Sequence, residues 1–267
     1  MSIIGNPLLL GGGSSTPSFP EFTYTGDYTV IYDDEDNWRI KFFTSGTLRI
    51  TSSNLIVEAF LVGGGGSGSS NNGGAGGGAG GGSGYTKTQI ARLQKDVDYE
   101  IVVGAGGSAP AANQLGNDGS ASAAFALTAR GGKGGGTGDG GDGGSGGGAA
   151  GQSTQDNAGD GGSNGSDGEN GYGSNVGGSG QSNTTREFGE STGDLYAGGG
   201  AGGQGNNTTV HVGGEGGGGN GGTTNTKATE GATNTGSGGG GRAWGTNTLG
   251  AAGGSGIVII RNHREVA

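Results

Sequence analysis

The sequence predicts an all-β protein, namely a jelly-roll-like β-sandwich that carries long glycine-rich inserts and essentially no α-helix. Short runs of alternating apolar and polar residues recur along the chain with turn residues between them, as in antiparallel sandwiches. No segment has the apolar period of about 3.6 residues that marks an amphipathic helix. Glycine accounts for 76 of the 267 residues and is concentrated in two blocks, whereas an average protein contains about 7% glycine.

Eight segments are predicted as strands from the alternation of their side chains. In the second of them, Trp38, Ile40 and Phe42 fall on one face. The acidic run 33–37 and the pair 45–46 provide the turns on either side of it. The predicted strands are residues 28–32, 38–43, 47–51, 55–62, 85–93, 99–103, 121–129 and 256–261.

Two of these strands define the organisation of the sheet. Residues 55–62 are apolar on both faces except at Glu58, which predicts a central strand. The last strand, 256–261, needs a sheet to join, and the other predicted strands all lie before residue 130. Both ends of the glycine-rich stretch between them are therefore expected to be anchored in one β-domain, because the cost of closing a loop grows only slowly with its length.

This reasoning divides the chain into three parts. Residues 1–20 form an N-terminal docking or linker segment. Residues 21–130 together with 256–262 form the sandwich, which has a short glycine-rich insert at 63–84. Residues 131–255 form the long glycine-rich insert with display loops.

The long insert shows a three-residue spacing that favours an ordered structure. Asp139, Asp142 and Ser145 recur at every third position. Polyglycine II is a left-handed extended helix with about three residues per turn and no internal hydrogen bonds. Its backbone must therefore pair with neighbouring helices, and only glycine lets those neighbours approach closely. We expect the glycine-rich inserts to pack as a bundle of such helices.

Two alternatives for the insert stay open. A flexible glycine linker is the simplest, and not every block has the three-residue period, since Ala75, Ala79 and Ser83 repeat at four. A calcium-binding β-roll needs a sustained nonapeptide repeat, whereas Asp139 lies one place early in the nearest match and no register persists.

Composition excludes several classes of function. The formal net charge is −10 and there is no cysteine. Disulfide scaffolds and sites with cysteine ligands are therefore excluded, and nucleic-acid binding is disfavoured because it depends on Lys and Arg. No run approaches the roughly 20 apolar residues of a membrane span, so we expect no membrane insertion.

Motifs that would carry chemistry are weak. Gly63, Gly65 and Gly68 match a dinucleotide fingerprint, but no helix follows and the match is nearly automatic in a glycine run. His211 and His263 are far apart in sequence and lack an evident partner base or nucleophile. The acidic residues 33–36, and Asp139, Asp142, Asp160 and Asp167, lack the spacing of a known metal loop. We expect no catalysis, no cofactor and no metal site.

The non-glycine islands within the long insert are the best candidates for binding. If the glycine blocks are rods, these islands are loops on a rigid scaffold, where binding groups are often found. Aromatic and arginine side chains dominate binding hot spots. An equally weighted alternative is that Phe188, Tyr196 and Trp244 pack against the β-domain or a neighbouring subunit. The candidate binding residues are Tyr172, Arg186, Phe188, Tyr196, Arg242 and Trp244.

The order of several short motifs resembles the glycine-rich domain of phage and prophage structural proteins. More distantly, the chain is similar to phage tail-fibre adhesins whose tips carry polyglycine helices joined by variable loops. The matching segments are Phe22-Thr23-Tyr24-Thr25-Gly26, Trp38-Arg39-Ile40-Lys41-Phe42, Ser45-Gly46-Thr47-Leu48, and residues 60–66, 99–107 and 253–260.

The resemblance implies a protein of the virion surface with no catalytic residues. We expect a tail-fibre or appendage tip that binds a host-cell surface glycan or protein through many weak contacts. The tail-fibre likeness also implies a homotrimer. Apolar residues near the N-terminus are then candidates for docking to other virion proteins, namely Ile3, Ile4, Leu8, Leu9 and Leu10.

Two other functions remain open from the sequence. One is a virion component without a receptor, such as a head fibre, a decoration protein or a tail-shaft protein. The other is a bacterial surface or matrix protein.

Overall fold

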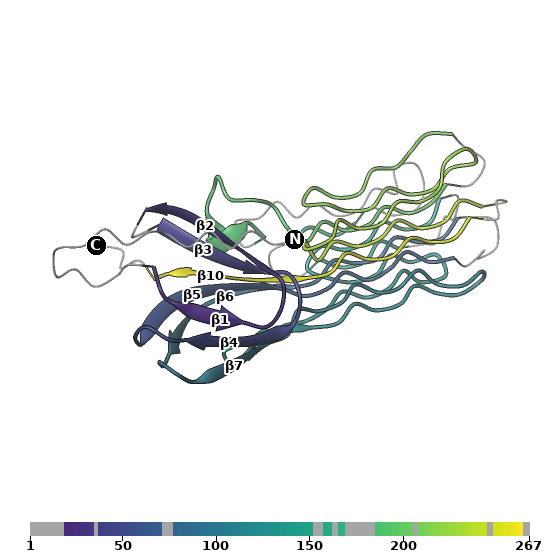
Figure 1. The fold of residues 1–267 in the computed structure, drawn as a ribbon. Coiled ribbons are helices and arrows are strands. Elements are labelled where there is room, and N and C mark those ends of the chain that lie inside the picture. The colour runs from purple at the N-terminus through teal and green to yellow at the C-terminus, as the bar shows by residue number, and fades with distance from the viewer. Residues whose placement is uncertain are drawn as a thin grey trace.

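The computed structural model describes residues 19–34, 37–70, 77–151, 157–161, 165–168, 185–204, 208–244 and 248–263. Figure 1 shows two regions along one long axis, a β-sandwich at one end and a bundle of side-by-side extended segments at the other. The described part of the chain contains ten strands, a single three-residue 3-10 helix at Glu187–Gly189 (η1) and no α-helix. The all-β prediction is confirmed, and no helix among the described residues is long and apolar enough to cross a membrane.

The sandwich has one large sheet, one small sheet and a hairpin. The large sheet has the order β2-β3-β10-β5-β6, and the small one has the order β1-β4-β7. All of their pairings are antiparallel. The strands are β1 (Phe22–Tyr24), β2 (Tyr28–Asp34), β3 (Asn37–Phe42), β4 (Gly46–Ile50), β5 (Leu55–Val62), β6 (Thr86–Leu93), β7 (Asp98–Ile101), β8 (Ser122–Ala124), β9 (Leu127–Ala129) and β10 (Ile257–Asn262).

The C-terminal strand β10 lies in the centre of the large sheet, as expected for a strand that closes the long insert. Val258 is paired with Phe42 of β3 on one side and with Leu61 of β5 on the other. β5 is itself flanked by β10 and β6, so the prediction that residues 55–62 form a central strand is confirmed. The two ends of the insert are therefore held in one sheet.

The large sheet is apolar on both faces, and each face has its own core. Between the two sheets, Trp38, Ile40 and Leu48 belong to a buried cluster that includes side chains from both. On the outer face, Phe60 and Ile259 belong to a second buried cluster. The alternation of side chains along β5 and β10 supplies both cores from the same strands.

The second region, which we call the glycine lattice, is built from the described residues of 63–85, 104–120, 130–168 and 197–256. Within segment 63–70, successive backbone N–H groups donate to three different neighbours in rotation. Gly63, Gly66 and Ser69 donate to segment 77–85, Gly64, Ser67 and Ser70 donate to 114–120, and Gly65 and Gly68 donate to 251–254. This three-residue rotation is the geometry of polyglycine II.

The carbonyl groups of segment 63–70 accept hydrogen bonds from three further directions. Gly64 and Ser67 accept from segment 132–135, Gly66 and Ser69 from segment 239–242, and Gly65 from Gly107. One segment thus has six hydrogen-bonded neighbours. The glycine-rich inserts therefore pack as polyglycine II helices, with the backbone groups paired laterally rather than along each helix.

Glycine is required in the lattice because the backbones nearly touch. A methyl group added at Gly203 would lie 1.8 Å from the carbonyl oxygen of Arg242, and one at Gly238 would lie 1.9 Å from that of Gly81. Most buried lattice positions that carry a side chain carry a small one, as at Ser67 and Ala201, both fully buried. Gln204, His211 and Arg242 are the larger buried exceptions among the described residues. The lattice is thus packed by its main chain.

One segment that the sequence analysis assigned to the sandwich belongs to the lattice. Residues 104–120 contain five glycines, and two of them, Gly116 and Gly119, donate to the carbonyls of Gly135 and Gly132. Residues 111–115 are exposed, so larger side chains are accommodated on the outward side. A peripheral helix needs glycine only where it faces other helices.

The predicted single strand at 121–129 is also corrected, because it is a hairpin. β8 and β9 pair from Ser122 opposite Ala129 to Ala124 opposite Leu127. The two-residue turn between them consists of Phe125 and Ala126, neither of which is a usual turn residue. The sequence therefore carries no local signal for this turn.

Candidate binding surfaces

Residues 185–197, which we call the strap, cover the outer face of the large sheet. The strap includes η1, and its Phe188, Tyr196 and Ala197 pack with side chains of β5 and β10 in the second core. The ring centroid of Phe60 lies 5.9 Å from that of Phe188 and 5.4 Å from that of Tyr196. The strap explains why β5 is apolar on both faces.

A buried carboxylate holds the strap to β3. Glu187 Oε1 lies 2.8 Å from Arg39 Nη1, and Glu187 Oε2 lies 2.6 Å from Lys41 Nζ, while the carboxylate side chain is fully buried. The Tyr196 hydroxyl donates to Glu187 Oε2 at 2.9 Å. Burial, reinforced by the Glu187 charge, raises the pKa of Tyr196 well above its usual range, so this hydroxyl remains a donor.

Arg261 of β10 extends this network. Its guanidinium pairs with Glu58 at 2.7 Å and with Glu190 of the strap, and it lies 4.1 Å from the centroid of the Phe188 ring. Burial raises the pKa of Glu190, but hydrogen bonds and charges from Arg261 and Arg39 outweigh it and lower that pKa overall. For Arg39, burial acts downward and is outweighed by Glu187 and Glu190, so its pKa is raised.

These contacts correct part of the predicted display surface. Phe188, Tyr196 and Arg242 are 8%, 4% and 5% exposed, so none is displayed on a loop. Large apolar rings find burial only against the sheet, because the lattice has no side-chain core of its own. Arg242 instead donates from Nη1 to the carbonyl of Ser70 at 3.0 Å within the lattice, and burial lowers its pKa.

The remaining candidates are less enclosed or lie elsewhere. Arg186 is half-buried in the strap and donates from Nη1 to the carbonyl of Gly193 at 2.8 Å. Trp244 is half-buried, and its backbone N–H donates to Gln204 at 2.9 Å. Tyr172 and the predicted docking residues Ile3, Ile4, Leu8, Leu9 and Leu10 lie outside the described residues.

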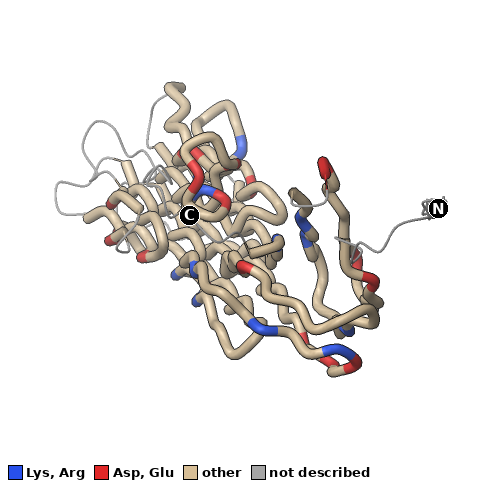
Figure 2. Tube along the Cα trace, turned by 90° about the vertical axis from the view of Figure 1, so that its left-hand side faces the viewer, with Lys and Arg blue, Asp and Glu red and all other residues tan. Residues whose placement is uncertain are grey.

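In the part of the chain that the structure describes, loops join extended segments at the far end of the lattice, opposite the sandwich (Figure 1). Apolar side chains are exposed on lattice segments outside the sandwich, including Leu115, Val210 and Leu249 at 50%, 41% and 43%. In Figure 2, charged residues lie at the margins of the lattice and on the sandwich. The lattice therefore presents a varied outer surface around a uniform interior.

Aspartates at the lattice margin act as hydrogen-bond acceptors, a role that the sequence analysis missed. Asp139 Oδ1 accepts the backbone N–H of Asn157 at 2.7 Å, and Asp142 Oδ1 accepts that of Asp160 at 2.9 Å. A carboxylate thus replaces the carbonyl of a missing neighbour. No group of three potential metal ligands occurs among the described residues.

His211, one of the two histidines considered for catalysis, lies inside the lattice. It is 6% exposed, and its Nδ1 lies 3.2 Å from Gln204 Nε2. His263 lies at the end of β10, where its backbone N–H donates to Ile56 at 3.2 Å. The structure does not place either ring in the hollow described below.

β2 forms an open edge of the large sheet. Every residue of the strand is exposed, and Tyr28 and Tyr32 are 43% and 50% exposed despite their size. Phe19 packs edge-on against Tyr32 with ring centroids 5.7 Å apart. An apolar edge strand of this kind is a place where another strand can add.

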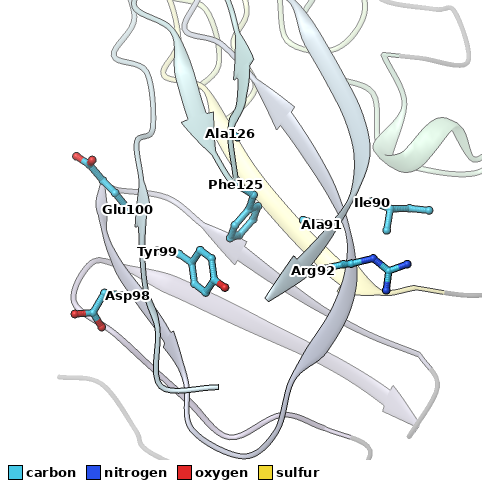
Figure 3. Close-up of a pocket in the computed structure, with 8 residues that line it drawn as sticks. All are labelled: Ile90, Ala91, Arg92, Asp98, Tyr99, Glu100, Phe125 and Ala126. Atoms are coloured by element: carbon cyan, nitrogen blue, oxygen red, sulfur yellow. The ribbon is translucent and has the colours of Figure 1, made fainter. Parts of the chain in front are cut away.

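A hollow of about 800 Å³ opens on the other side of the sandwich, between β6, β7 and the β8–β9 hairpin. Figure 3 shows the rings of Tyr99 and Phe125 near each other in it, whereas the side chains of Asp98, Glu100 and Arg92 point away from these rings. The two ring centroids are 5.8 Å apart at an interplanar angle of 64°. The sequence analysis did not find this site, because its residues come from separate strands.

Comparison with known proteins identifies the family. The sequence matches the glycine-rich domain over residues 43–263, which is most of the chain and includes both regions of the fold. A search of curated proteins found no match. The chain therefore belongs to the glycine-rich domain family.

Proposed function

We propose that the chain is a structural protein of a bacteriophage virion, located at a tail-fibre or other appendage tip, where it binds the host-cell surface. The observation that carries this proposal is the arrangement of the molecule along one axis. A sandwich at one end anchors a rigid lattice, and the lattice ends in loops at the other (Figure 1). A scaffold of this form suits the presentation of loops to a large external surface.

Rigidity supports a display role. Each residue of segment 63–70 donates a backbone hydrogen bond to a different helix from its neighbours in sequence, so bending this segment would break bonds in several directions. A rigid scaffold lowers the entropy cost of binding, because the loops are already positioned. Weak contacts at several copies then add by avidity.

Assembly is part of the same proposal. Residues Met1–Leu10 dock the chain to another virion protein, and the chain acts as a homotrimer, as the tail-fibre resemblance implies. The exposed edge of β2 offers the sandwich a surface for contacts with subunits or with other virion proteins. The loops at the far end of the lattice then face outward from the particle, toward a host glycan or protein.

The test is immunogold electron microscopy with two antibodies, one raised against the sandwich and one against the loops at the far end. On virions of the phage or prophage that encodes the chain, we expect label on an appendage and inhibition of adsorption by the anti-loop antibody alone. Label without inhibition contradicts host binding and indicates a purely structural virion component. Absence of label from purified virions contradicts the virion assignment and favours a bacterial surface protein.

Deletion of Met1–Leu10 tests the docking segment separately. We expect the shortened chain to fold, as judged by an unchanged melting temperature, and to be missing from assembled virions by immunoblot. Normal incorporation of the shortened chain contradicts the docking role. A chain of equal length in which Ile3, Ile4, Leu8, Leu9 and Leu10 are replaced by Ser controls for length.

A further inference from the structure

The large sheet ends in an exposed strand on each side. Its order β2-β3-β10-β5-β6 leaves β2 and β6 with a paired neighbour on one side only among the described strands. Every residue of β2 is exposed, and so is most of β6. Both strands carry exposed apolar side chains, with Ile31 36% and Ile90 46% exposed. Unpaired edges of this kind are templates to which a further strand can add.

The backbone of β2 offers hydrogen-bonding groups to such a strand. The carbonyl of Asp27, just before β2, accepts the N–H of Phe43, so the odd-numbered residues of β2 bond to β3. The backbone groups of Val30, an even-numbered residue, therefore point away from the sheet, because the direction alternates along a strand.

The backbone of β6 offers the same groups at the opposite edge. The N–H of Gly63 donates to the carbonyl of Tyr85, just before β6, so the odd-numbered residues of β6 bond to β5. The backbone groups of Thr88 and Ile90 then point outward. In the described part of the chain, no strand or side chain pairs with these outward groups of either edge.

The two edges run in the same direction. Four antiparallel pairings separate β2 from β6 across the sheet, so the direction reverses an even number of times. A second copy placed beside the first without being turned over therefore sets its β2 parallel to β6. The two large sheets then continue into each other with their outer faces on the same side.

The outer face of each edge strand is known from its neighbours. On β2 it carries Thr29 and Ile31, because the residues opposite them on β3 bind the strap. On β6 it carries Thr88, Ile90 and Arg92, because Thr88 lies opposite a residue of the second core and side chains alternate. Figure 3 shows Ile90 and Arg92 projecting away from the rings in the hollow.

One parallel register matches the two edges residue by residue. It sets Thr29 beside Thr88, Ile31 beside Ile90, and Asp33, at the end of β2, level with Arg92. The same register places the outward backbone groups of Val30 between those of Thr88 and Ile90, as a parallel ladder requires. Each exposed isoleucine thus meets the other, and an acid meets a base.

The charges of the edges favour this pairing over pairing of like edges. β2 ends in Asp33 and Asp34, whereas β6 carries Lys87 and Arg92 and no acidic residue. Two β2 strands paired antiparallel about Val30 would set Asp27 opposite Asp33, and two β6 strands would bring four cations together. Charges on edge strands prevent association of like edges, and here the opposite signs leave one combination open.

We propose that β2 of one copy adds to β6 of the next in this parallel register, so that the large sheets of neighbouring copies form one continuous sheet. The contact is heterologous, because each copy uses two different surfaces. The inference rests on the homotrimer of the proposed function and names the surfaces that join it. Each copy gives β2 to one neighbour and β6 to the other.

The test is a disulfide cross-link in the purified full-length chain, which has no cysteine of its own. The double variant Ile31→Cys, Ile90→Cys should form covalent oligomers on a non-reducing gel after mild oxidation. Each single variant should stay monomeric there, because each new thiol faces an isoleucine. The replaced side chains are partly exposed, so we expect an unchanged melting temperature. The matched control, Ile31→Cys with Gln89→Cys, places the second thiol on the opposite face of β6 and should not cross-link.

Sedimentation velocity gives a second measurement without cross-linking. Val30→Pro removes an N–H that points away from β3, and proline is tolerated on edge strands at such positions. We expect the dissociation constant of the assembly to rise by about tenfold, as for the loss of one backbone hydrogen bond. Val30→Thr keeps the N–H and the branched side chain and should assemble as wild type does.

Three outcomes would overturn the interface. The first is a wild-type chain that sediments at its own mass of 25.3 kDa at every concentration. The second is a cross-link in either single variant, which would assign the contact to two like edges. The third is equal cross-linking in the double variant and its Gln89→Cys control. Assembly through these edges in a chain that is absent from virions would instead overturn the proposed function and leave the interface standing.

Discussion

The sandwich and the glycine lattice are stabilised in opposite ways. The sandwich buries large side chains such as Trp38, Ile40 and Phe60, and its stability comes mainly from apolar area removed from water. The lattice buries no large apolar side chain among its described residues, and its backbone groups bond to surrounding helices in several directions. One chain therefore contains a region packed by side chains and a region packed by main chain.

This difference predicts how the stability of each region responds to substitution. In the sandwich, making a residue smaller opens a cavity. In the lattice, making a residue larger separates the helices that the backbone hydrogen bonds join, as at Gly238. Ordering glycine is costly in entropy, so the lattice depends on nearly all of its lateral bonds forming together.

The largest effect is expected in the sandwich. Phe60→Ala should lower the free energy of unfolding by about 4 kcal/mol, because it empties the fully buried contact between β5 and the strap. Urea unfolding followed by tryptophan fluorescence measures the change. Phe60→Leu, which keeps most of the volume, should lose about 1 kcal/mol; equal losses for both variants would show that volume is not what matters here.

The next effect tests the lattice in the opposite direction. Gly238→Ala adds one methyl group 1.9 Å from the carbonyl oxygen of Gly81 and should cost about 3 kcal/mol. The amides of Gly219 and Gly238 should lose protection from hydrogen exchange, because the N–H of Gly219 donates to the carbonyl of Gly238 and that of Gly238 donates to Gly198. The matched control is Gly136→Ala, where the nearest atom is 3.0 Å away. Similar losses of stability in the two variants would show that close backbone packing is not what limits side-chain size in the lattice.

A smaller effect is expected at the junction that joins β3 to the strap. Glu187→Gln keeps the size of the side chain but removes the charge that faces Arg39 and Lys41, and should cost about 2 kcal/mol. Asp194→Asn removes another partner of Lys41, but that carboxylate is 75% exposed, so at most about 0.5 kcal/mol is expected. Equilibrium unfolding measures the free energy of unfolding of both variants. Equal losses of stability in the two would show that the burial of Glu187 does not matter.

The smallest predicted effect is a pH dependence at Glu190. Its pKa in the folded state lies below the usual 4.5, since Arg261 and Arg39 outweigh burial. Its contribution to stability is therefore present above about pH 4.5 and is lost as the pH falls through the folded-state pKa. Comparing wild type with Glu190→Gln at pH 7 and pH 3, we expect a difference of about 0.5 kcal/mol at pH 7 that is smaller at pH 3. A stability difference between the two proteins that increases from pH 7 to pH 3 would contradict the prediction.

Much of the fold was predictable because its signals are local. Residues 55–62 are the bounds of β5 as predicted, and the apolar C-terminal strand joins the sheet as its composition requires. The three-residue period at Asp139 and Asp142 correctly indicated helices with three residues per turn, and both side chains are exposed at the margin. Each of these features depends on neighbours within a few positions in the sequence.

The candidate sites were less predictable because they depend on distant contacts. Phe188 and Tyr196 were proposed as binding residues or as residues packed against the β-domain, and the structure buries them on β5 and β10. The hollow was missed altogether. Its floor joins Tyr99 of β7 with Phe125 of a hairpin whose turn lacks Asn and Gly, so no motif marks it.

The sequence by itself determined that this protein is all-β and that its last strand closes a long insert, and its three-residue spacing favoured extended glycine helices over a flexible linker. Alternation and glycine spacing are sufficient for those conclusions, because they constrain the backbone locally. Only the tertiary structure decided which helices are neighbours, which aromatic rings are buried and where a hollow remains. Glycine helices have almost no side chains with which to encode a register, so their neighbours are chosen by the sheet that anchors both ends and by the backbone hydrogen bonds of the whole lattice.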